Sequence, residues 1–143
     1  MKLKLESMEG VQVETSALVS SGFESDEPDV ALPATLAKTL GVWPTWDFDL
    51  EDYETAAGET TLPKVRAAVK VKLADVKEMR EIKCNAVVNP DINEVLLSDY
   101  LTDELGITVI SFRRGLWRHI TDSQQIVREH KTTVLVAGVP QCL

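Results

Sequence analysis

The sequence predicts a mainly β fold: a closed β-barrel with two short internal helices and a C-terminal helix. Short apolar segments with a period of two recur along most of the chain, which is typical of strands with one buried face. Turn-forming Gly, Pro, Asn and Asp residues separate these segments at the close spacing of a small barrel. The 143 residues, 44% of them hydrophobic, suit a single domain, residues 1–143, around one core.

The first part of the chain predicts two strands, an acidic loop and a helix. Lys2 to Leu5 and Val11 to Val19 alternate apolar with polar side chains, so both predict strands. Glu24 to Asp29 is rich in carboxylates without the spacing of a calcium loop, and we expect a solvated, mobile loop there. Pro33 to Leu40 predicts a helix, because proline suits a first helical turn and Gly41 suits the position after the last.

The middle of the chain predicts a long hairpin and one further strand. After a connector from Trp43 to Asp52, the arms of the hairpin are Tyr53 to Ala56 and Thr60 to Leu73, joined at Ala57-Gly58. In the second arm, the apolar side chains at every second position from 65 to 73 face one way. Arg and Lys side chains face the other, as in a strand with a wet side. Ile82 to Val88 repeats this alternation.

The last part of the chain alternates strands with helices. Val95 to Leu97 is uniformly apolar, which indicates a strand buried on both faces. Ser98 can cap a helix from Asp99 to Leu105 that ends at Gly106. Three further elements complete the order: a hairpin of Ile107 to Phe112 and Leu116 to His119, a helix from Thr121 or Asp122 to about His130, and a strand from Thr132 to Ala137.

Composition excludes several classes of function. The 15 basic and 23 acidic residues give a net charge of −8 with no basic cluster, so we expect no nucleic-acid partner. No apolar run approaches the ~20 residues of a membrane helix, and the N-terminus lacks the apolar block of a signal peptide. We therefore expect a cytoplasmic protein with no membrane partner. The spacing of the cysteines and histidines predicts no metal, no cofactor and no disulfide framework, with Cys84 a buried thiol and Cys142 a frayed terminal one.

Two stretches of the chain share one plan. Ala17 to Ser20 is followed, after a loop, by the helix that closes Leu40-Gly41-Val42. Val95 to Ser98 is followed directly by the helix that closes Leu105-Gly106-Ile107. In each, an apolar strand ends in a serine and leads to a helix that ends in Leu-Gly and a β-branched residue.

Four segments, in order, carry a family resemblance: Leu18 to Phe23, Leu32 to Gly41, Glu54 to Glu59 and Leu96 to Gly106. They resemble the retropepsin-like aspartic protease fold in its single-domain bacterial and archaeal form. In that family a strand ends in Asp-Thr/Ser-Gly, a helix ending in Leu-Gly follows, and a flap hairpin precedes a second strand and helix. The resemblance covers about residues 11–119 and implies a homodimer in which each chain supplies one copy of the site. Residues 120–143 form an extension.

The chain departs from this family at the catalytic position. The family's aspartate falls on Ser20, and its apolar-apolar-Gly triplet becomes Leu96-Leu97-Ser98. Aspartic proteolysis needs two carboxylates that share one proton, and a serine hydroxyl is neutral near pH 7 and cannot be that base. The resemblance therefore implies a catalytically inactive homodimer that binds an extended peptide or acts as a scaffold.

The resemblance also implies two groups of site residues. Ser20, Ser21 and Gly22 form the degenerate active-site turn, in which the Ser21 hydroxyl keeps a structural role. The binding groove and flap are expected at six positions: Phe23, Tyr53, Ala57, Gly58, Leu97 and Ser98.

Other interpretations of these residues stay open. A peptidase or other hydrolase could use a substitute carboxylate, for which the candidates are Asp26, Asp29 and Asp99. Ser20 would be a nucleophile only with His119 or His130 as its base, and a polar turn is the favoured interpretation.

The aromatic residues also allow two interpretations. Trp43, Trp46, Phe48 and Tyr53 form either an apolar plug over a barrel end, which we favour, or a groove for an extended peptide. A partner that covered this region would make the protein a structural subunit of a larger assembly. Trp117 is expected in the core or in an interface.

Overall fold

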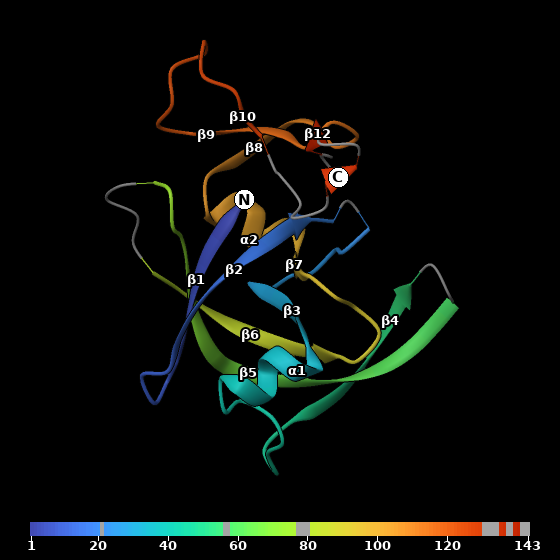
Figure 1. Ribbon diagram of the computed structural model, residues 1–143. Helices are drawn as coiled ribbons and strands as arrows, with labels where there is room; N and C mark the ends of the chain where they lie inside the picture. The colour runs from blue at the N-terminus through green and yellow to red at the C-terminus, as the bar shows by residue number, and fades with distance from the viewer. Residues whose placement is uncertain (21, 56–57, 77–80, 130–134, 137–138, 141–143) are drawn as a thin grey trace.

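The centre of the fold is a β-sheet that closes on itself (Figure 1). The computed structural model describes residues 1–20, 22–55, 58–76, 81–129, 135–136 and 139–140. Its main sheet has seven strands in the order β1-β2-β7-β3-β6-β5-β4, and an additional pairing of β1 with β5 closes six of them into a barrel. The prediction of a mainly β chain with a closed barrel is therefore confirmed.

The strands and helices have these bounds. The barrel strands are β1 (Lys2–Ser7), β2 (Gln12–Val19), β3 (Asp29–Pro33), β5 (Gly58–Leu73), β6 (Ile82–Asn89) and β7 (Val95–Leu97), and β4 (Asp49–Thr55) extends the sheet beyond β5. The helices α1 (Ala34–Thr39) and α2 (Asp99–Glu104) lie inside the stretches predicted to be helical. A second sheet contains β8 (Ile107–Ser111), β9 (Leu116–His119) and β10 (Arg128–Glu129), and β11 (Leu135–Val136) pairs with β12 (Val139–Pro140). No helix in the described part of the chain combines the length and apolar character needed to cross a bilayer.

The barrel interior is filled by every second side chain of its strands. In β1, Leu3 and Leu5 are fully buried while Lys2 and Lys4 are exposed, which is the alternation that predicts a strand. Trp117 of β9 also lies in the main core, as one of the two interpretations expected. Removing these aliphatic and aromatic side chains from water is the main favourable term for the fold.

The two echoing stretches of the sequence lie side by side. β2 and β7 pair in parallel, with Ala17 opposite Val95 and Val19 opposite Leu97. The Ser20 backbone N–H donates to the Leu97 carbonyl at 3.5 Å, just beyond the last pair. The ends of β2 and β7, and the serines that follow them, therefore meet at one edge of the barrel.

A β-bulge interrupts the predicted alternation of β5. The register with β6 shifts between Val65 and Val69, and Ala67 has a φ of 49°. Ala67 is therefore exposed rather than facing inward, and Ala68 takes the inward position. The Asn85 side chain stabilises the bulge, because its Oδ1 accepts from the Ala67 N–H at 2.9 Å.

The acidic stretch is only partly the solvated loop that the sequence predicts. Its last residue, Asp29, begins β3 and is 1% exposed. β3 pairs with β6 and β7 along its two edges, and it is buried on both faces because Val30 and Leu32 belong to the main core while Ala31 belongs to a second, small apolar cluster. A strand buried on both faces has no alternation, so the five residues from Asp29 to Pro33 gave no periodic signal.

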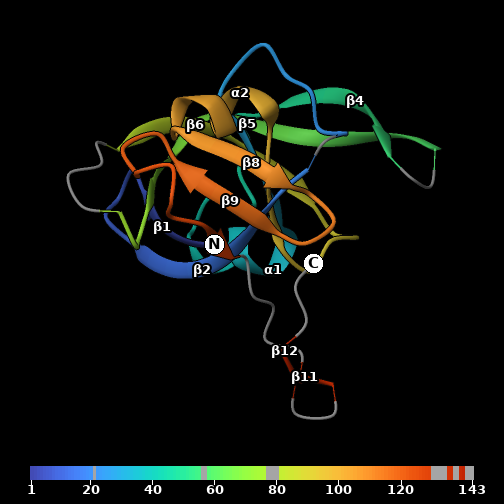
Figure 2. The same ribbon diagram turned by 90° about the horizontal axis from the view of Figure 1, so that it is seen from above.

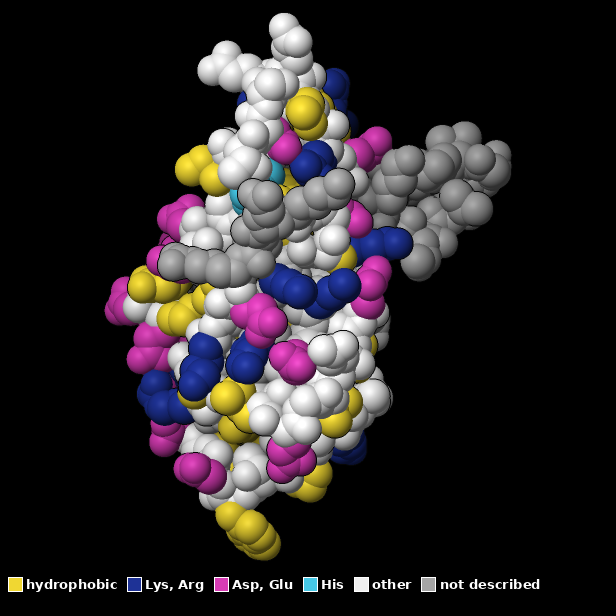
Figure 3. Space-filling view, turned by 90° about the vertical axis from the view of Figure 1, so that its left-hand side faces the viewer, with side chains coloured by type: hydrophobic (Ala, Val, Ile, Leu, Met, Phe, Trp, Pro, Cys, Tyr) yellow, Lys and Arg dark blue, Asp and Glu magenta, His cyan; other side chains and the backbone are white. Residues whose placement is uncertain are grey.

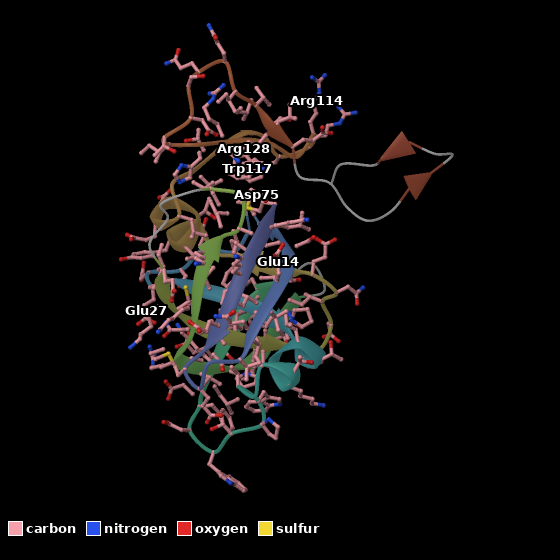
Figure 4. The ribbon with its side chains drawn as sticks, turned by 60° about the vertical axis from the view of Figure 1, so that its left-hand side comes forward. Glu14, Glu27, Asp75, Arg114, Trp117 and Arg128 are labelled. Carbon is pink, nitrogen blue, oxygen red and sulfur yellow. The ribbon has the colours of Figure 1, made fainter. Side chains whose placement is uncertain are left out.

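The helix expected from Thr121 or Asp122 to about His130 is wrong for the described residues, 121–129. Side chains there bond to turns instead: the Asp122 carboxylate accepts from the His119 N–H at 2.9 Å and from Arg128 Nε at 2.7 Å. The Arg128 Cζ lies 5.4 Å from the centre of the Trp117 ring, and its Nη1 donates to the Asp75 carbonyl at 3.4 Å. Figure 4 labels these three residues. Figure 2 shows the β8–β9 hairpin beside α2. Of the strand expected from Thr132 to Ala137, only Leu135–Val136 lies among the described residues, and it is a strand.

Candidate functional site

The turn after β2 is held against the start of α2. The Phe23 N–H donates to the Ser20 carbonyl at 3.2 Å, and the Phe23 carbonyl accepts from the Asp99 N–H at 2.9 Å. The Asp99 Oδ1 in turn accepts from the Ser25 N–H at 2.9 Å. Gly22 is exposed, and Ser21 lies outside the described residues. A backbone hydrogen bond therefore links Phe23 to Ser20, and the contacts with Asp99 hold this segment against helix α2.

Phe23 and Tyr53, two of the predicted groove residues, contact each other. Their ring centres lie 6.2 Å apart with the planes at 86°, an edge-to-face arrangement. Both rings are half-buried, and they pack on a small apolar cluster separate from the main core. Its other members are Ala31, Leu62, Val87, Ile92 and Leu96. We name this surface, including both rings, the aromatic patch; it lies between the turn and the β4–β5 hairpin.

The other predicted groove residues are placed differently. Leu97 and Ser98 are fully buried, so neither lines a surface groove. Ser98 has a structural role: its Oγ accepts from the Leu101 N–H at 3.2 Å and caps α2 as predicted. Gly58 lies exposed at the start of β5 with a φ of 105°, which fits a hairpin end, and Ala57 lies outside the described residues.

A buried ion pair, which the sequence did not indicate, anchors the acidic segment. The Lys64 ammonium, on a residue 3% exposed, lies 3.0 Å from the carboxylate of Asp29. It also lies 3.0 Å from Glu27 and 3.5 Å from Glu51. Burial alone lowers the pKa of Lys64, but the hydrogen bonds that Lys64 donates to the carboxylates of Asp29 and Glu27 outweigh it and raise the pKa. Lys64 therefore stays protonated, with three carboxylates around it.

Arg66 and Asn85 extend this charged network to the surface. Arg66 donates to Asp49 at 2.7 Å and to Glu27 at 2.9 Å, and Asn85 Nδ2 donates to Glu27 and Asp29. The hydrogen bond from Lys64 is the main cause that lowers the pKa of Glu27. Glu27 is labelled in Figure 4. On the face seen in Figure 3, acidic and basic side chains are interspersed over the barrel.

The three candidate substitute acids differ in their surroundings. Asp29 is occupied by the Lys64 pair and also accepts from Ser25 Oγ at 2.6 Å. Asp26 is exposed. Asp99 shares with Ser20 a shallow hollow of about 420 Å³, whose wall also includes Phe112. The Asp99 Oδ1 is already bonded to backbone N–H groups, so its first role is to hold the turn.

Neither histidine provides a base for Ser20 in the described residues. His119 is 4% exposed, with Nδ1 2.7 Å from Thr121 Oγ1 and Nε2 3.0 Å from the Leu105 carbonyl. Both ring nitrogens are therefore occupied away from Ser20, and a nucleophilic serine needs a base within hydrogen-bond reach. His130 lies outside the described residues.

The tryptophans near the hairpin have different surroundings. Trp43 packs against the main core and contacts Phe48 edge to face at 5.1 Å, so the interpretation as a plug fits Trp43. Trp46 is fully exposed, at 101%. Tyr53 belongs instead to the aromatic patch. The aromatic residues of this stretch are thus divided between the core, the solvent and the patch.

The described residues offer no ready metal centre, because they contain no group of three or more His, Cys, Asp or Glu side chains arranged to hold an ion. The described chemistry consists of a serine turn whose neighbour Asp99 is already bonded, a half-buried aromatic patch and a charged network beside it. No family model matches this chain and no curated protein matches its sequence, so its function has to be argued from these sites.

Proposed function

We propose that this protein binds an extended peptide at the aromatic patch and does not cleave it. The observation that carries the proposal is the contact of Phe23 with Tyr53, which joins the turn after β2 to the β4–β5 hairpin. Half-buried aromatic rings beside a sheet edge can take alternate side chains of an extended peptide, while the backbone gives further hydrogen bonds.

The absence of hydrolysis follows from the groups around Ser20. A shared proton between two carboxylates is the basis of aspartic proteolysis, and Ser20 supplies neither carboxylate nor general base. Asp29 is locked in its pair with Lys64, and the amides of Ser25 and Tyr100 occupy Asp99 Oδ1. These contacts support a binding role over a catalytic one.

The binding proposal can be tested with random dodecapeptides displayed on phage and selected on the purified protein. The selected peptides, labelled with fluorescein, should bind the Phe23→Ala and Tyr53→Ala variants at least about tenfold more weakly, because each ring offers an apolar contact area. Ile120→Ala removes an exposed apolar side chain outside the patch and outside the hollow beside Ser20, and it serves as the control. Equal affinity for wild type and Phe23→Ala, with unchanged circular dichroism, would contradict the proposal.

The second part of the proposal is tested by incubation with casein between about pH 3 and pH 7, the range in which carboxylate dyads work. We expect no cleavage. Cleavage that purifies with the protein and disappears in Asp99→Asn would instead support a hydrolase with Asp99 as the substitute acid. Cleavage that disappears only in Ser20→Ala would indicate a serine nucleophile.

A further inference from the structure

The β4–β5 hairpin ends the main sheet with a free strand edge. β4 is the last strand in the sheet order, and among the described residues it pairs with β5 alone. Figures 1 and 2 show the hairpin extending beyond the barrel. A free edge presents unpaired backbone N–H and C=O groups that can pair with another strand.

The register shows which residues present those groups. Thr55 and Gly58 are opposite each other on either side of a two-residue connection, a hydrogen-bonded position, and such positions alternate along an antiparallel pair. Leu50 therefore occupies a position without bonds to β5. Its partner there is Pro63. Proline has no N–H to donate, which fits a position that makes no hydrogen bonds to β4. The backbone groups of residues 50, 52 and 54 consequently face the free edge.

The outer part of this edge carries negative charge that no ion pair among the described residues balances. Arg66 and Lys64 neutralise Asp49 and Glu51, at the inner end of β4. Glu54, by contrast, lies directly opposite Glu59 in the register, and both are exposed.

Like charges in that arrangement destabilise a hairpin. In the described part of the chain, neither Glu54 nor Glu59 has a basic partner. The Asp52 carboxylate next to them accepts from the neutral Thr61 hydroxyl at 2.6 Å.

We infer that the free edge of β4 is a docking site for an extended basic segment of another protein. The segment would add as a further strand on the backbone of residues 50, 52 and 54, with lysine or arginine side chains beside Asp52 and Glu54. A second copy of this chain is a poor occupant, because two β4 edges would place acidic side chains against each other. The inference rests on the proposed function, since it specifies the peptide, its charge and its backbone contacts.

The preference for a basic segment is tested with two fluorescein-labelled heptapeptides. One alternates lysine with valine, and the other alternates glutamate with valine. The lysine peptide should bind, and more weakly as salt rises, because exposed ion pairs are screened. Asp52→Asn with Glu54→Gln should weaken its binding about tenfold, from two lost cross-strand pairs. Glu9→Gln with Glu14→Gln removes the same charge from exposed sites outside β4, so it should change affinity less than about twofold. Equal losses in the two double variants would overturn the inference.

Backbone pairing is tested with Asp52→Pro. The N–H of residue 52 faces the free edge, so proline there leaves the β4–β5 hydrogen bonds intact but blocks an incoming strand. The lysine peptide should lose binding, while phage-selected peptides that depend on Phe23 alone should keep it. Unchanged binding of the lysine peptide to this variant would overturn the inference. If selected peptides bind at Phe23 and the lysine peptide never binds, the docking site fails and the proposed function stands; if neither binds, both fail.

Discussion

Replacing Lys64 with methionine should destabilise the barrel far more than the same change at an exposed lysine. Methionine keeps most of the unbranched chain but removes the ammonium group. Asp29, which is 1% exposed, then remains as a buried carboxylate without a cation. Its remaining partners are neutral: the Ser25 hydroxyl at 2.6 Å and the Asn85 amide at 2.9 Å. A buried charge that has lost its counter-ion cannot recover its hydration, so the folded state loses free energy.

The distances and exposures set the size of this loss. Breaking a buried ion pair by removing one partner costs about 3–5 kcal/mol. Two neutral hydrogen bonds to Asp29 survive, which places the expected loss at the lower end, about 3 kcal/mol. Glu27 and Glu51 add little, because their side chains are 42% and 35% exposed and water screens their interaction with Lys64.

Urea unfolding followed by tryptophan fluorescence measures this change. With a slope near 2 kcal/mol per molar, the midpoint should fall by about 1.5 M. Lys4→Met, at an exposed position of β1, is the matched control and should change stability by less than about 0.5 kcal/mol. Asp29→Asn in the Lys64→Met background should recover part of the loss, because it removes the stranded charge. Equal midpoints for Lys64→Met and Lys4→Met would show that the buried Asp29–Lys64 pair does not stabilise the barrel.

Further predictions concern the reactivity of Cys84, the helix cap at Ser98 and the oligomeric state. Burial, helped by the charge of Asp29, raises the pKa of Cys84 to about 12, so Cys84 in a Cys142→Ser variant should resist iodoacetamide near pH 8, and the fold should lose stability as pH rises above about 9, where the unfolded thiol ionises. Rapid alkylation under native conditions would show that this thiol is accessible. Ser98→Ala removes the α2 cap and an acceptor for the Asp29 N–H, and should lower the free energy of unfolding by about 1–2 kcal/mol in urea titrations. The homodimer implied by the family resemblance predicts twice the 15.8 kDa chain mass in light scattering at micromolar concentration, and a lone monomer would refute it.

The fold could be predicted from the sequence where side chains alternate or a cap is present. Lys2 to Leu5 and Ile82 to Val88 alternate, and both are strands. Ser98 predicted the start of α2, because its side chain satisfies an N–H that the helix leaves free. The prediction failed at β3, which is buried on both faces, and at residues 121–129, where arginine and aspartate side chains bond to turns that a helical pattern does not anticipate.

The candidate site could be predicted only in part. The turn at Ser20 and the residues Phe23 and Tyr53 were identified through the family resemblance, and the last two do meet. Lys64 could not be found in the same way. It lies on the face of β5 that the alternation predicts to be wet, and it becomes buried only because the acidic segment folds over it. Burial of this kind depends on a contact between distant segments, which a local pattern cannot contain.

The charged network also bears on the pH at which the protein acts. The pKa of Glu27 is lowered in the fold, so its contribution to stability is present above its ordinary value and is lost as pH falls through the folded value. The pKa of Lys64 is raised, so its contribution is complete below about 10.5 and is lost as pH rises through the folded value. Both contributions are therefore present near neutral pH, and the acidic segment that follows the Ser20 turn is held most firmly there. Because the lowered pKa keeps Glu27 ionised below its ordinary value, peptide-binding measurements near neutral pH examine the surface with this charged network intact.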